Sequence, residues 1–349
     1  MVSNVAPTEG FVSLRLEAVD PLRATQRMVF QARAANWVRI RLYPPAGSQT
    51  FALGDLQLGG ALGPPETHYA FGETPADAID IIGALEGIGR ADLELTALEQ
   101  EIFERASEGE LNSEDFVSIA LLASGVVETE ARTTYHQQID ALVDRARAND
   151  TPDAPIDQRG GALLTFLHET AFTDGYREGQ TNLSTLLDGG VYNCVSSAVL
   201  YNAVALRLGM DTRAIEVPDH AFSIVYDGLD HMDVETTTPD GFNPARDRVD
   251  TFEQLTGFRY IPQSNTAKRR EIGTAGLAAL IYYNPGVTHL AAGRYQDALF
   301  ANFRALSLDP GFASAGTNAL AALGRWSAEL SDDGAWQDST EIAAVAVRL

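Results

Sequence analysis

The chain has 349 residues, 45% of them hydrophobic and 21% charged, which predicts a folded protein of two or three domains and excludes a disordered one. Its 48 acidic and 25 basic residues give a formal net charge of −23, which disfavours nucleic acids and anionic membranes as partners. A single cysteine excludes an internal disulfide and a cysteine-based zinc site.

No apolar run approaches the roughly 20 residues that a membrane-spanning helix needs. The first residues also lack the basic leader and apolar stretch of a signal peptide, so we expect a cytoplasmic protein. The sequence shows no pattern typical of a cofactor site, and we expect neither a cofactor nor a resident metal.

The first two segments differ in the period of their apolar residues. Residues 1–65 favour strands, most clearly in WVRIRLY (37–43), where apolar and polar side chains alternate. Residues 66–155 carry apolar residues at three- and four-residue spacing, as in SEDFVSIALLASGVV (113–127), and are predicted to be helical. The polar, turn-rich stretch 149–161 is typical of a linker.

The third segment, 156–262, carries the candidate chemistry. In GGVYNCVSSAVLYNAVALRLGM (189–210) a glycine pair precedes an apolar-periodic run, which predicts a helix with Cys194 in its first turn. AFSIVYDG (221–228) and HMDVETTT (231–238) are predicted to be two strands joined by a tight turn.

Cys194, His220 and Asp233 are the candidate catalytic residues. The free N–H groups and the dipole of a helix start favour a thiolate at Cys194. His220 begins one predicted strand and Asp233 lies on the next, so the carboxylate is expected to face the imidazole and orient it. A nucleophile, a base and an orienting carboxylate in this arrangement form a thiol version of a catalytic triad.

The order NCVSSAVLYNAVALRLGM, PDHAFSIV and HMDVETTTPDGFNP resembles the transglutaminase-like branch of the papain-type cysteine enzymes. The resemblance implies an α+β core in which a helix carrying the cysteine packs on an antiparallel sheet carrying the histidine and the aspartate. It also implies that Cys194 is the nucleophile, His220 the base and Asp233 the orienting residue. An oxyanion hole would combine the Cys194 backbone N–H with an upstream amide, for which Gln180 is the first candidate and Asn193 the second.

Several alternatives stay open at this point. A lone cysteine is often a small buried apolar residue, which is the structural interpretation of Cys194. Glu235 shares a strand face with Asp233 and is a second candidate for the orienting carboxylate. His231 could join His220 and Asp233 in a metal site. Neither serine after the cysteine has the glycine elbow of a serine nucleophile.

The last segment, 263–349, is predicted to be helical and resembles tetratricopeptide repeats. Small residues, an aromatic and a proline stand where that repeat packs two antiparallel helices: Gly286, Gly293, Tyr295, Ala298, Ala305 and Pro310. AGRYQDAL (292–299) returns as DGAWQDST (333–340), 41 residues later. The pattern predicts helical hairpins docked on the core, with either a groove for a partner protein or plain helical packing.

The sequence therefore predicts an α+β thiol enzyme with N-terminal β and helical segments and C-terminal repeat helices. The expected reaction is attack by Cys194 on an amide or isopeptide carbonyl of a peptide or protein, through a thioester that water or an amine resolves. The alternatives are an acyltransferase that uses the same thioester and a catalytically inactive scaffold that binds a partner protein.

Overall fold

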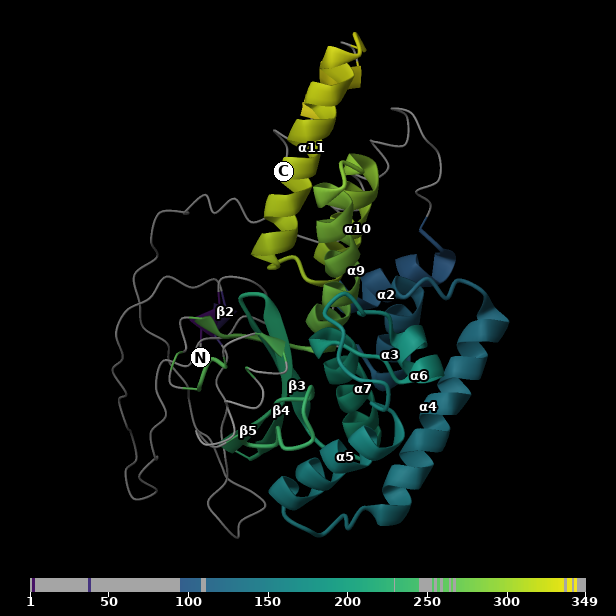
Figure 1. The fold of residues 1–349 in the computed structure, drawn as a ribbon, viewed down its shortest axis with the longest axis vertical. Coiled ribbons are helices and arrows are strands. Elements are labelled where there is room, and N and C mark those ends of the chain that lie inside the picture. Colours follow the sequence, from purple (N-terminus) through teal and green to yellow (C-terminus); the bar gives the residue numbers. More distant parts are fainter. Residues whose placement is uncertain are drawn as a thin grey trace, which may run out of the picture.

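The computed structural model describes residues 2–3, 37–38, 95–107, 111–228, 230–244, 253, 256–257, 260–263, 265, 268–335, 338–340 and 342–343. These residues form helices and a small antiparallel sheet, so the fold is α+β (Figure 1). Before residue 95 the described elements are two paired strands, β1 (Val2–Ser3) and β2 (Trp37–Val38). The other strands and helices expected there lie outside the described residues.

The main sheet has four antiparallel strands in the order β5-β4-β3-β6. Their bounds are β3 (Thr212–Val217), β4 (His220–Asp227), β5 (Asp230–Val234) and β6 (Arg270–Ile272). The predicted strand at 221–228 is confirmed as β4. The strand predicted over 231–238 is too long, because the chain leaves β5 after Val234 and turns back through 236–240.

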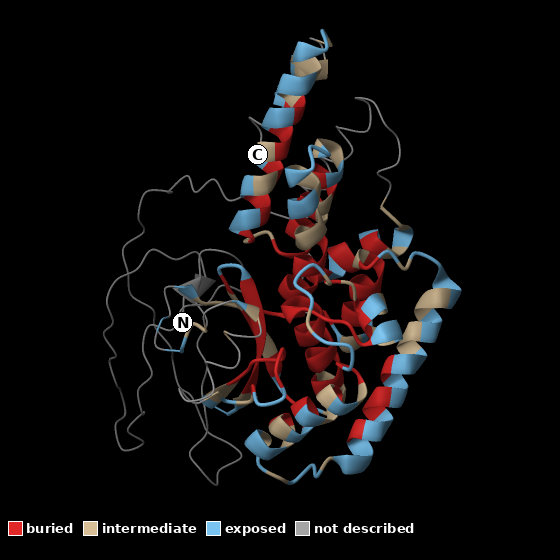
Figure 2. Ribbon diagram, in the orientation of Figure 1, coloured by how far each residue is buried: buried red, intermediate tan, exposed pale blue. Residues whose placement is uncertain are grey.

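Helix α7 (Cys194–Arg207) packs on one face of this sheet and confirms the predicted helix. Successive side chains of β4 point to opposite faces of the sheet. Ala221 and Val225 therefore join the main hydrophobic core on the α7 side, while Phe222 and Ile224 belong to a second cluster on the other side. The Asn202 amide of α7 donates to Ser223 Oγ of β4 at 2.6 Å. Figure 2 shows α7 buried along its length between the sheet and the surrounding helices.

Among the described residues, five further helices precede α7 in the chain; the last four contact α7, and the first packs on the second (Figure 1). They are α2 (Ala97–Ser107), α3 (Ser113–Ala123), α4 (Thr129–Asn149), α5 (Ile156–Thr170) and α6 (Leu183–Gly189). The linker expected at 149–161 is shorter than predicted, because its last six residues already belong to α5. Asp157 and Gln158 are exposed there, whereas Arg159 pairs with Asp150 at 2.7 Å.

The C-terminal helices α9 (Thr274–Ala291), α10 (Tyr295–Leu308) and α11 (Ala313–Asp332) stack on one another. The turn after α9 contains Gly293 with φ of +74°, and the turn after α11 repeats it with Gly334 at +79°. These two glycine turns lie 41 residues apart, which is the interval between AGRYQDAL and DGAWQDST. Gly286 allows close packing of α9 on α10, because a Cβ there would lie 2.8 Å from the amide nitrogen of Asn302.

A buried ion pair joins these helices to the sheet. Arg270 of β6 lies 2.6 Å from the carboxylate of Asp309, at the end of α10, and also pairs with Glu216 of β3. The Arg270 guanidinium stands over the ring of Phe312, 5.3 Å from its centroid. Among the described residues, no helix is long and apolar enough to cross a membrane.

Candidate functional site

Cys194 is the first residue of α7, and the residues around it fix the helix start. Asn193 Oδ1 accepts hydrogen bonds from the backbone N–H groups of Val195 and Ser196, both at 3.0 Å. The Ser196 hydroxyl in turn accepts from the Asn193 N–H at 3.0 Å, which completes a capping box. The N–H of Cys194 itself has no acceptor among the described residues.

An isolated β-bridge positions residues 191–193, which directly precede Cys194. Gly190 ends α6 with a φ of +73°, and a Cβ there would lie 2.2 Å from the Thr173 hydroxyl, so only glycine fits. Beyond it, Tyr192 forms a parallel bridge with Tyr176. The glycine pair noted in the sequence therefore turns the chain so that residues 191–193 run beside residues 174–177.

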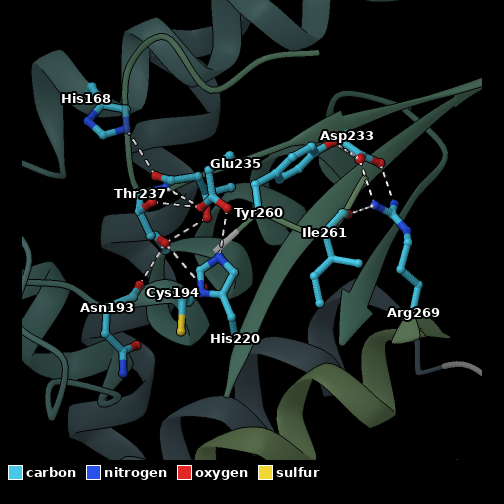
Figure 3. Close-up of polar contacts among 12 residues, drawn as sticks. His168, Asn193, Cys194, His220, Asp233, Glu235, Thr237, Tyr260, Ile261 and Arg269 are labelled. Carbon is cyan, nitrogen blue, oxygen red and sulfur yellow. Dashed lines mark hydrogen bonds and ion pairs between the residues drawn. The ribbon is translucent and has the colours of Figure 1, made fainter. Parts of the chain in front are cut away.

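His220 lies beside Cys194, as predicted. It is the first residue of β4, its side chain is almost completely buried, and its ring lies next to the Cys194 side chain (Figure 3). Its Nε2 lies 2.7 Å from Glu235 Oε2. Because a carboxylate accepts, Nε2–H is the donor, and Nδ1 is left on the side of the ring that faces the cysteine.

Glu235, and not Asp233, is therefore the carboxylate that orients His220. Its other oxygen, Oε1, accepts from the Thr237 hydroxyl at 2.7 Å and from the Thr237 N–H at 3.3 Å. The Glu235 N–H donates to the Gly241 carbonyl at 2.8 Å, and a Cβ on Gly241 would lie 1.9 Å from the Glu235 carbonyl oxygen. The turn after β5 thus closes tightly around this carboxylate.

Asp233 has a different set of partners, so its predicted contact with His220 is wrong. Its two carboxylate oxygens accept from the Arg269 guanidinium at 2.7 and 2.9 Å. It also accepts from the Tyr260 hydroxyl and, at 3.4 Å, from the Gln263 amide. Figure 3 shows this group on the far side of Tyr260 from the histidine. Asp233 holds the segment before β6 against the sheet.

The strand register explains this correction. The turn between Asp227 and Asp230 pairs Asp233 with Ile224. His220 lies four residues farther from the turn than Ile224, so its partner position on the second strand lies beyond the end of β5. Counting outward from Gly228 places His220 opposite position 237, which argues against Asp233 but does not by itself select Glu235, the other candidate.

A second layer of hydrogen bonds holds the Glu235 turn against α7 and α5. The Ser197 hydroxyl of α7 lies 2.8 Å from the Thr236 hydroxyl. His168 of α5 donates from Nε2 to the Thr236 carbonyl at 3.1 Å, and burial lowers the pKa of His168. The Tyr192 hydroxyl donates to the Thr237 carbonyl at 3.1 Å. No sequence pattern indicates this role of His168, because its partner is a backbone carbonyl 68 residues away.

Of the two amides expected in the oxyanion hole, the Asn193 amide already donates twice, whereas the Gln180 amide uses one of its two N–H groups. The Asn193 amide donates to the Glu178 carbonyl and the Thr181 hydroxyl, both at 2.9 Å, while its oxygen caps α7. The Gln180 amide donates to the Asn182 carbonyl at 3.0 Å. Thr181 also accepts from the Asn284 amide of α9 at 2.9 Å, which ties the C-terminal helices to this loop. The Asn193 amide is therefore structural, and the role of the second Gln180 N–H stays a prediction.

Tyr176 is a site residue that the sequence did not reveal. Its hydroxyl is buried and has no hydrogen-bond partner among the described residues. Burial and then the charge of Cys194 raise the pKa of Tyr176, so the hydroxyl stays protonated. The bridge to Tyr192 is what places it there.

The other candidates do not join the site. His231 pairs with Tyr226 on β4, and their rings lie 5.6 Å apart, away from His220. In the part of the chain that the structure describes, no three histidine, cysteine, aspartate or glutamate side chains lie close enough to hold a metal ion. The hydroxyls of Ser196 and Ser197 hydrogen-bond within the α7 cap and the Glu235 turn.

The electrostatics of His220 predict how stability depends on pH. Burial alone would lower the pKa of His220, but the charges of Glu235 and Cys194 raise it to about 10, above the value of about 6.5 for a free histidine. The charged pair should therefore stabilise the folded protein fully below about pH 6.5, and this stabilisation should be lost as the pH rises towards 10. Urea unfolding at pH 6.5 and pH 10 measures the loss.

The control for this prediction is the Glu235→Gln variant, which lacks the carboxylate. Its free energy of unfolding should fall less than that of the wild type over the same pH interval, since other groups titrate equally in both proteins. An equal fall in the two proteins would contradict the charged pair.

No protein-family model matches this chain, and neither a curated protein nor a solved structure is detectably similar to it.

Proposed function

We propose that the protein is a thiol-dependent acyl-transfer enzyme in which Cys194, His220 and Glu235 form the catalytic triad. The observation that carries the proposal is the buried chain of contacts from the cysteine through His220 to a carboxylate that is only 1% exposed. A buried histidine that only filled space would not need a carboxylate at 2.7 Å and a cysteine on its other side. This geometry favours catalysis over the structural interpretation of the cysteine.

Each residue has a separate task in this mechanism. The Cys194 sulfur attacks a carbonyl carbon, and its N–H at the start of α7 donates to the oxygen that becomes negative. His220 takes the thiol proton and later gives it to the leaving amine. Glu235 fixes the ring orientation and stabilises the imidazolium. Water or an amine then attacks the thioester carbonyl, which releases the acyl group and restores the thiol.

Peptides, proteins or their isopeptide-linked forms are the proposed substrates. The resemblance to transglutaminase-like enzymes supports this choice, and so does the contact of Asn284 of α9 with Thr181, whose hydroxyl also accepts from the amide of Asn193, next to Cys194. The repeat-like helices thus reach the loop that flanks the nucleophile. Water and an amine both remain acceptors for the thioester in this proposal.

The test uses 4-nitrophenyl acetate, an activated ester that reports acyl transfer without knowledge of the natural substrate. The wild type should release a burst of 4-nitrophenol close to one equivalent per chain and carry an acetyl group on Cys194, which mass spectrometry locates. The Cys194→Ala variant should show no burst. A wild type whose folded state gives neither burst nor acetylated cysteine would be a scaffold rather than an enzyme.

A further inference from the structure

The oxyanion site around Cys194 is incomplete when only the expected residues are counted. The Cys194 N–H supplies one donor, whereas the Asn193 amide already donates twice and the Gln180 amide donates one of its two N–H groups. A tetrahedral intermediate of acyl transfer usually receives two donors, because its oxygen carries a full charge. A buried donor near Cys194 that has no partner among the described residues is the best candidate for the second position.

Tyr176 has the properties that this position requires. Its hydroxyl is buried and has no partner among the described residues, which is a cost to folding unless a ligand satisfies it. Tyr176 forms a bridge with Tyr192, which lies two residues before Cys194. Two backbone hydrogen bonds fix this bridge, from Arg177 N–H to the Tyr192 carbonyl at 2.8 Å and from Tyr192 N–H to the Gly175 carbonyl at 3.3 Å. The other buried tyrosine at the site, Tyr192, already donates to Thr237.

We propose that the Tyr176 hydroxyl is the second oxyanion donor, acting together with the Cys194 backbone N–H. This inference rests on the proposed function. As the sulfur–carbon bond forms, the carbonyl π electrons move onto oxygen, and the Tyr176 O–H donates a hydrogen bond to it without giving up its proton. When the carbonyl re-forms, the leaving group departs with the bond electrons, and the hydroxyl returns to its resting state.

The experiment compares two reactions of the same sulfur. Acetylation by 4-nitrophenyl acetate passes through an oxyanion, whereas alkylation by iodoacetamide displaces iodide at a saturated carbon and forms none. The Tyr176→Phe variant should therefore acetylate Cys194 about 100-fold more slowly, the usual effect of losing one oxyanion donor, and alkylate it at close to the wild-type rate. Tyr201→Phe is the matched control, because it removes a buried hydroxyl that donates to the Gly160 carbonyl.

Two results would overturn the assignment. Equal acetylation rates in Tyr176→Phe and wild type would show that the hydroxyl contributes nothing to the transition state. Equal slowing of acetylation and alkylation would show that Tyr176 acts on the sulfur or on its exposure and not on the oxygen. A wild type that is alkylated but never acetylated would instead contradict the proposed acyl transfer itself, so the two failures are distinguishable.

Discussion

Replacing Glu235 with glutamine is expected to slow acetylation of Cys194 at neutral pH by at least about 100-fold, because the same exchange of carboxylate for amide in a serine triad costs about 10⁴-fold. The amide keeps nearly the same shape but removes the charge that holds His220 as an imidazolium. The Glu235→Asp variant keeps the charge on a shorter side chain and should restore part of the rate. Burst kinetics with 4-nitrophenyl acetate measure all three proteins.

Asp233→Asn is the matched control, since it makes the same chemical change two residues away. Asp233 accepts from Arg269 and has no contact with His220, so the acetylation rate should stay close to that of the wild type. The free energy of unfolding should instead fall by about 3–5 kcal/mol, because a buried guanidinium loses its partner. A larger loss of acetylation in Asp233→Asn than in Glu235→Gln would restore the original assignment of Asp233.

The sequence predicts the helix and the strands that carry this site, because apolar residues recur in them at regular spacing. The glycine pair before Cys194 and the apolar period after it predict both the start of α7 and its buried position. The alternation in β4 and the glycine at its end predict the hairpin that carries His220. These features depend on local chemistry and on hydrophobic burial, which a sequence shows directly.

The residues that complete the site depend on tertiary contacts that leave no local pattern. Glu235 meets His220 only because the chain turns back after Val234, so strand alternation alone could not rank it above Asp233. Tyr176 lies in an irregular segment and gains its place from a single bridge to Tyr192. Gln180 and Asn193 both carry an amide, but the Asn193 amide donates to a carbonyl and a hydroxyl, and the Gln180 amide donates once to a carbonyl. Donor type in a sequence does not show whether a donor is free.

The C-terminal helices help to hold the loop that precedes α6 next to the site. Asn284 donates to Thr181, which also accepts from the residue that caps α7. The buried pair between Arg270 and Asp309 fixes the same helices to the sheet. The C-terminal helices therefore contact both the loop that holds the cap of α7 and the sheet that carries His220.

The rate of alkylation of Cys194 by iodoacetamide at pH 6, in wild type and in His220→Ala, tests the central claim most directly. Cys194 is the only thiol in the chain, so every label reports it. A cysteine without help is only about 0.3% thiolate at pH 6, and an adjacent imidazolium raises that fraction. We expect His220→Ala to react about 100-fold more slowly, with His289→Ala, a half-buried histidine that pairs with Asp297, unchanged. Equal rates in wild type and His220→Ala would contradict a catalytic pair at this site.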